Sequence, residues 1–174
     1  DWIAGARAAL IARGVNALKI GPLARRLRVT RGSFYWHFTD HADLLRELLK
    51  AWEHTNTAPF ERVVNEDAAH DGARELIAIA RLWLDERDFS PAFDTAVRDW
   101  ARVSPPAATV VRRVDGRRIT LLHRIFINLR FTHPEALVRA RTMYFHQVGY
   151  YALDIRDEPA RRRALAPVFL HVLS

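Results

Sequence analysis

The chain has 174 residues, 49% of them apolar, which is enough to bury a sizeable core and argues against disorder. It contains no cysteine, which excludes disulfides, thiolate zinc sites and cysteine nucleophiles. The formal net charge is +7, and residues 1–50 hold nine Lys/Arg against four Asp/Glu, so most of the excess lies in under a third of the chain. This pattern favours a basic region that binds a polyanion, joined to a nearly neutral body.

Helical periodicity dominates the sequence, and strand signals such as period-two alternation and Asn-Gly hairpins are almost absent. The predicted fold class is therefore all-α, with about nine helices. They span residues 1–13, 20–27, 31–37, 41–64, 69–87, 90–102, 105–130, 134–154 and 159–174. We expect two domains, a three-helix head at 1–45 and a larger helical body at 46–174.

Individual residues mark several of these boundaries. Gly14 is suited to end the first helix, and Pro22 is tolerated in the first turn of the second. Thr30 can cap the third helix, and Asp40, three residues before another aspartate, resembles a capping box. Pro167 falls inside the last predicted helix and is expected to kink or split it.

The first three helices are short and tightly linked, which is typical of a helix-turn-helix. A seven-residue helix is not stable alone in water, so a small core must hold it. The residues expected to form that core are Leu10, Leu18, Leu23, Leu27, Val29, Phe34 and Phe38. Held in this way, the third helix can enter a DNA major groove.

The segment from Leu23 to Leu45 reads LARRLRVTRGSFYWHFTDHADLL. It resembles the signature of TetR-family regulators, in which Leu-Ala is followed by Val-Ser/Thr-x-Gly/Pro-x-Phe/Leu-Tyr-x-His-Phe and then by a new helix start and leucine. About 27 residues carry this resemblance, at fixed spacing. Beyond residue 46 the chain resembles the family only in the number and length of its helices.

The resemblance implies which residues face DNA. They are Lys19, Thr30, Arg31, Gly32, Ser33, Tyr35, His37 and His41. Arg31 is the best candidate for reading a base edge, because Arg bidentate to guanine is the commonest specific contact. Tyr35 and His37 would hold phosphates or a thymine methyl, and Gly32 would permit close approach of the backbone.

Two positions depart from the family pattern. His41 stands where family members usually have a lysine that reaches a phosphate, which weakens that contact unless the imidazole is protonated. Lys19 stands where the second helix usually has a Thr or Ser cap, and a lysine cannot accept a capping hydrogen bond.

No metal site, cofactor or catalytic function is predicted. His37 and His41 have metal-ligand spacing, but the expected break at Thr39-Asp40 separates them onto two helices. The sequence has no HExxH motif, P-loop, dinucleotide glycine motif or nucleophile elbow, and an enzyme is the least favoured class. No apolar run is long enough to span a membrane, and the first residues do not resemble a signal peptide, so a cytoplasmic protein is expected.

Aromatic residues recur in the body, where they form either an ordinary helical core or the walls of a ligand pocket. Family resemblance favours the pocket. The residues predicted to line it are Trp83, Phe93, Trp100, His123, Phe126 and Tyr144, with Asn128, His146 and Gln147 as further polar groups. Because the walls carry few charges, the expected effector is a small, largely apolar molecule.

The segment after residue 143 is apolar nearly all round, which a one-sided surface helix does not require. A homodimer interface explains this pattern, and a buried hairpin within a monomer is the alternative. The residues predicted for the interface are Tyr151, Leu165, Val168, Phe169 and Val172.

The sequence therefore predicts a DNA-binding transcriptional regulator that binds a palindromic double-stranded operator as a homodimer. The favoured mechanism is a repressor that a small molecule releases from DNA. The alternative is a DNA-binding regulator without a small-molecule inducer, which acts as an activator or is controlled by a protein partner.

Overall fold

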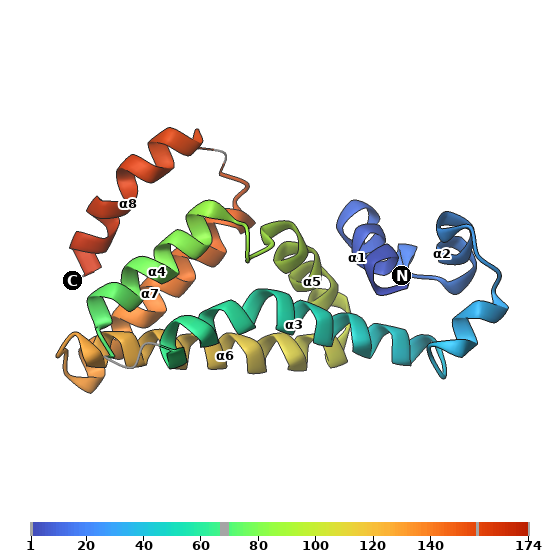
Figure 1. The fold of residues 1–174 in the computed structure, drawn as a ribbon, viewed down its shortest axis with the longest axis horizontal. Coiled ribbons are helices and arrows are strands. Elements are labelled where there is room, and N and C mark those ends of the chain that lie inside the picture. Colours follow the sequence, from blue (N-terminus) through green and yellow to red (C-terminus); the bar gives the residue numbers. More distant parts are fainter. Residues whose placement is uncertain (1, 67–69, 156, 174) are drawn as a thin grey trace. The chain divides into compact units, whose positions relative to one another are not determined.

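A computed structural model describes residues 2–66, 70–155 and 157–173, and every regular element within those ranges is helical (Figure 1). The α-helices are α1 (Trp2–Arg13), α2 (Ile20–Leu27), α3 (His41–Glu66), α4 (Gly72–Asp85), α5 (Pro91–Val103), α6 (Pro105–Asn128), α7 (His133–Ala152) and α8 (Pro159–Leu173). Two 3₁₀-helices, η1 (Val15–Ala17) and η2 (Gly32–Trp36), complete the described elements. The all-α fold class is confirmed, with eight α-helices described instead of about nine. The predicted helix boundaries at residues 1, 69 and 174 lie outside the described residues.

The breaks between the first helices follow the predicted chemistry. Gly14 ends α1 in the left-handed region, at φ 71°, and its N–H donates to the Leu10 carbonyl at 2.8 Å. Pro22 lies in the first turn of α2. The Asp40 carboxylate accepts from the Asp43 N–H at 2.7 Å, while the Asp43 carboxylate accepts from the Thr39 N–H at 2.9 Å, so both carboxylates cap the start of α3.

The third predicted α-helix, at 31–37, is instead the 3₁₀-helix η2. Its backbone bonds join residues three apart, Ser33 N–H to Thr30 O and Phe34 N–H to Arg31 O, both at 3.2 Å. Local side-chain bonds compete with an α-helical ladder here. The Ser33 N–H also donates to Thr30 Oγ1 at 3.3 Å, as predicted for a cap, and Ser33 Oγ donates to the Thr30 carbonyl at 2.9 Å.

The predicted split at Pro167 is wrong, because α8 is continuous from Pro159 to Leu173. The proline removes one helical donor, and the carbonyl of Arg163 loses its usual partner. Both residues are exposed, so water can reach that carbonyl and the helix tolerates the loss.

The head core is largely as predicted, with Leu10, Leu18, Leu23, Phe34 and Phe38 all buried. Leu27 is half-buried. The prediction for Val29 is wrong, since its side chain is 41% exposed. Val29 lies in the turn after Arg28, whose backbone is left-handed at φ 58°. Trp2, which is absent from the predicted core, is buried and packs edge-on against Phe34 with ring centroids 5.3 Å apart.

The chain divides into two compact units that do not follow sequence order. One comprises Asp1–His54 and Ala92–Arg112, and the other comprises Thr55–Pro91 and Arg113–Ser174. In the first unit, Trp52 Nε1 donates to Asp94 Oδ1 at 3.0 Å, which joins α3 to α5. In the second, α8 packs against α4 (Figure 1), beside a core built around Phe60, Ile79 and Phe126. The predicted boundary at residue 45, between the three-helix head and the helical body, stays a prediction.

Candidate DNA interface and body pocket

The segment Gly32–Trp36 presents aromatic side chains to solvent from a rigid base. Tyr35 is 63% exposed and Trp36 is 87% exposed, and His37 is also exposed. Phe34 and Phe38, which flank these three residues in the sequence, are buried, with ring centroids 5.2 Å apart. The buried pair holds the segment in place, so the exposed side chains can meet a partner at little cost in conformational entropy.

A shallow groove in the first unit brings together four of the predicted DNA-facing residues. It is lined by Lys19, Ile20, Gly21, Arg31, Tyr35 and His41. The Arg31 guanidinium packs over Gly21, where a Cβ atom would lie only 2.5 Å from Arg31 Nη2. Two cationic side chains and one phenol thus line a concave surface, which is suited to a phosphate backbone.

His41 has a structural role in addition to its place in the groove. Its Nε2 lies 2.8 Å from the Leu18 carbonyl oxygen. A carbonyl only accepts, so Nε2 must carry the proton and donate. This bond ties the start of α3 to the segment before α2 and leaves Nδ1 as the only ring nitrogen for a phosphate.

The remaining predicted DNA-facing residues lie in η2 or directly beside it. Thr30 and Gly32 are exposed, and Ser33 is half-buried. The Thr30 and Ser33 hydroxyls bond to each other's backbone groups. They therefore fix the backbone conformation of the segment, and a contact with DNA would compete with these bonds.

Sequence reasoning left Trp36 out of the site residues, although it is the most exposed aromatic side chain described. Arg25, Arg26 and Arg28, near the end of α2, are also exposed. The signal for Trp36 was present in the sequence. An aromatic residue between two core phenylalanines, out of phase with both, has no core to enter.

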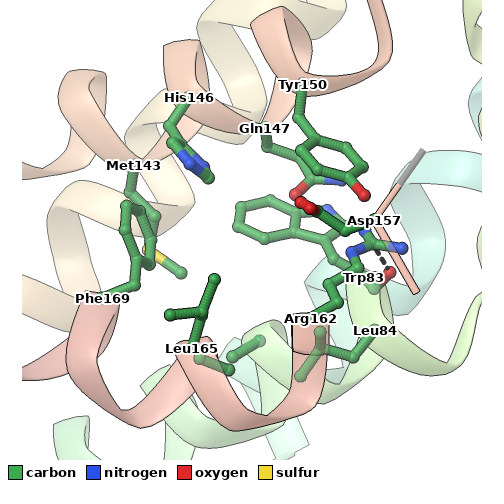
Figure 2. A pocket seen from close by; sticks show the side chains of 12 residues that line it. Trp83, Leu84, Met143, His146, Gln147, Tyr150, Asp157, Arg162, Leu165 and Phe169 are labelled. Carbon is green, nitrogen blue, oxygen red and sulfur yellow. Dashed lines mark hydrogen bonds between the residues drawn. The ribbon is translucent and has the colours of Figure 1, made fainter. Parts of the chain in front are cut away.

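The second unit contains a pocket of about 140 Å³ between α4, α7 and α8 (Figure 2). It is lined by Ala80, Trp83, Leu84, Met143, His146, Gln147, Tyr150, Asp157, Arg162, Leu165, Ala166 and Phe169. Trp83 is the one residue of the six predicted for a ligand pocket that lies here. His146 and Gln147, expected as polar groups, also line it.

The other predicted pocket residues lie elsewhere. Phe126 and Tyr144 are buried in the core of the second unit, and His123 is half-buried with its ring 5.5 Å from that of His133. Phe93 and Trp100 are buried in the first unit, where the Arg7 guanidinium lies 4.9 Å from the Phe93 ring centroid. Asn128 donates to Glu75 Oε2 at 2.9 Å.

The residues predicted for a dimer interface differ in exposure. Val168 and Val172 are exposed, at 58% and 75%. Leu165 and Phe169 line the pocket from α8. Tyr151 is half-buried and its hydroxyl donates to Glu86 Oε1 at 2.7 Å, which is a contact within the chain.

Residues 2–66, 70–155 and 157–173 contain no cluster of three or more histidine or carboxylate side chains arranged to hold a metal ion. Within those same ranges, none of the helices combines the length and apolar character needed to cross a bilayer.

One match to a known family lies in the N-terminal region. The model for "Bacterial regulatory proteins, tetR family" matches residues 3–48. The HTH-type transcriptional regulator SrpR of Pseudomonas putida is 31% identical over 72 residues, which is 41% of this chain and 32% of that protein. The HTH-type transcriptional regulator AcrR of Shigella flexneri is 44% identical over 41 residues, covering 24% of this chain and 18% of that protein.

A third relative is an uncharacterized HTH-type transcriptional regulator, TtgW, which also comes from Pseudomonas putida. It is 31% identical over 72 residues, which is 41% of this chain and 51% of that protein. The similarity therefore covers at most about half the length of these curated relatives. The match to the family model coincides with α1, α2, η2 and the start of α3, where the exposed basic groove lies. Residues 3–48 of this chain are therefore similar to bacterial regulatory proteins of the tetR family.

Proposed function

We propose that this chain is a DNA-binding transcriptional regulator that binds a palindromic operator as a homodimer. The observation that carries the proposal is the groove of Lys19, Arg31, Tyr35 and His41 on a base of buried phenylalanines, within the matched region. Cationic side chains in an exposed groove suit both phosphate contact and base reading. The similar proteins are named as transcriptional regulators, which supports the same class.

We further propose that the regulator is a repressor and that a small, largely apolar molecule releases it from DNA. What supports this is a mostly apolar pocket in the second unit, lined by none of the residues of the basic groove. Release requires that the molecule binds the DNA-free conformation more tightly than the DNA-bound one. The alternative is a regulator without such an inducer, and a screen of small molecules for thermal stabilisation separates the two.

The test of DNA binding is the Arg31→Ala variant, measured against an operator obtained by selection from random duplexes. Arg31→Ala is expected to lose about 1–3 kcal/mol of binding free energy at the operator and to relax one base preference. Arg141→Ala is the matched control, because it removes an exposed arginine from α7 and should leave operator affinity unchanged. Equal losses on operator and random DNA would reduce Arg31 to a phosphate contact. No binding by the wild-type protein at low salt would overturn the proposed function.

A further inference from the structure

Two buried hydrogen-bond donors, on residues that line the pocket of the second unit, have no partner among the described residues. They are the indole Nε1 of Trp83, from α4, and the amide Nε2 of Gln147, from α7. The two side chains belong to residues only 4% and 7% exposed, so water does not freely reach them. Figure 2 shows both among the side chains that surround the pocket.

An unpartnered buried donor is costly, and most buried polar groups in folded proteins are paired. One such group can be an accident of packing. Two of them, on residues of different helices that line one pocket, favour a site that receives hydrogen-bond acceptors. The donors also restrict the chemistry, because neither an indole N–H nor an amide N–H can accept a hydrogen bond.

The charged side chains of the pocket are already paired within the chain. Arg162 forms an ion pair with Glu86, and its Nη2 donates to the Trp83 carbonyl at 3.0 Å and to the Tyr151 hydroxyl at 2.8 Å. Asp157 lies 3.7 Å from Arg161 Nε. Burial, together with the nearby charge of Arg162, lowers the pKa of the His146 imidazole from its ordinary value of 6.5, so this ring is neutral near pH 7. A charged ligand would therefore find no dedicated counter-ion.

The remaining walls are apolar, with Met143, Leu165 and Phe169 among them. The volume of about 140 Å³ is close to that of an engineered cavity of roughly 150 Å³ that binds benzene. One six-membered ring with a short substituent fits such a space.

We propose that this pocket binds a small, neutral, single-ring aromatic compound whose carbonyl-type oxygen accepts hydrogen bonds from Trp83 Nε1 and Gln147 Nε2. The inference names a ligand class for the proposed inducer, and in that respect it rests on the proposed function. It also moves the ligand site away from Phe93, Trp100 and Phe126, where sequence reasoning placed it.

The test uses acetophenone as the probe and ethylbenzene as its match, which has the same ring and similar shape but no acceptor. Protein with ¹⁵N-labelled indoles gives one N–H signal for each of its five tryptophans, and Trp83→Phe identifies the signal of Trp83. Acetophenone is expected to shift that signal downfield and to raise the melting temperature. Ethylbenzene is expected to produce no downfield shift.

The Gln147→Leu variant separates hydrogen bonding from shape. It replaces an unpartnered amide with an apolar group of similar size. The variant should therefore fold at least as stably as the wild-type protein. The acetophenone dissociation constant is expected to rise about tenfold relative to that of ethylbenzene. Thr142→Val, an exposed change on the same helix, should alter neither constant.

The proposal would be overturned if Gln147→Leu left the ratio of the acetophenone and ethylbenzene dissociation constants unchanged. It would also be overturned if acetophenone did not move the Trp83 signal. Tighter binding of benzoate than of acetophenone would overturn the neutral class and identify an anion site. These measurements contain no DNA. A compound that binds here and leaves operator affinity unchanged therefore contradicts ligand-induced release, while the inference about the pocket stands.

Discussion

At the scale of single residues, the lack of a side chain at Gly21 determines where the Arg31 guanidinium lies. The Arg31 guanidinium occupies the space that a Cβ atom at position 21 would need. The guanidinium is the far end of a flexible side chain, so it can be displaced without moving the backbone. The absence of a side chain at position 21, near the start of α2, therefore leaves room for a group that is predicted to read a base.

We expect Gly21→Ala to fold normally and to weaken operator binding, because the new methyl group displaces the Arg31 guanidinium from its groove. Gly116→Ala is the matched control, since no heavy atom lies within 4 Å of its added Cβ in α6. Equilibrium binding and thermal denaturation of both variants check the prediction. If Gly21→Ala bound the operator as tightly as Gly116→Ala does, the packed position of Arg31 would have no role in recognition.

At the scale of elements, one arginine fastens α8 to the end of α4. Arg162 contacts Glu86 and the Trp83 carbonyl, and its guanidinium lies 4.6 Å from the Tyr150 ring centroid. Glu86 follows α4 in the left-handed region at φ 53°. Burial raises the pKa of the Tyr151 hydroxyl well above its usual range, so the phenol keeps its proton and donates to Glu86. The contacts converge on the point where α4 ends.

Arg162→Met is expected to loosen α8, because it leaves Glu86 and the Trp83 carbonyl without their charged partner. Hydrogen bonds to charged groups contribute about 1.5–3 kcal/mol, and the exposure of Glu86 places this loss toward the lower end. Hydrogen exchange of the amides in α8 measures the effect. Arg163→Met, its exposed neighbour, controls for loss of charge alone. Equal protection in the two variants would show that α8 is held by apolar packing.

Many of the helix boundaries could be predicted from residues close to them in the sequence. The predictions that failed did so for physical reasons. Gly14 marks the end of a helix, and Pro22 and Asp40 mark the starts of two others, because their effects depend on adjacent residues only. The 3₁₀ form of η2 escaped prediction because two competing hydrogen bonds of Thr30 and Ser33 decide it. The sequence indicates that aromatic residues of the body face inward. It does not distinguish a residue packed in the core, such as Phe126, from one that lines a pocket, such as Trp83.

At the scale of the whole molecule, the predicted homodimer remains to be measured. Exposed apolar side chains on α7 and α8, including Phe145, Val168 and Val172, are costly to leave in water. Sedimentation at micromolar concentration is expected to give about twice the chain mass of 20.1 kDa. Val168→Asp should shift the protein toward monomer and weaken operator binding. Val103→Asp, at a 73% exposed site in α5, should do neither. A monomeric wild-type protein would remove the basis for a palindromic operator.

The uneven exposure of the five tryptophans gives this protein a built-in optical reporter. Trp2, Trp52, Trp83 and Trp100 are each at most 5% exposed, whereas Trp36 is 87% exposed. The red edge of the emission spectrum and nearly all quenching by iodide therefore come from a single indole on the candidate DNA interface. Loss of that quenching would follow occupation of the interface in real time, in unlabelled protein, while the four shielded indoles provide an internal reference.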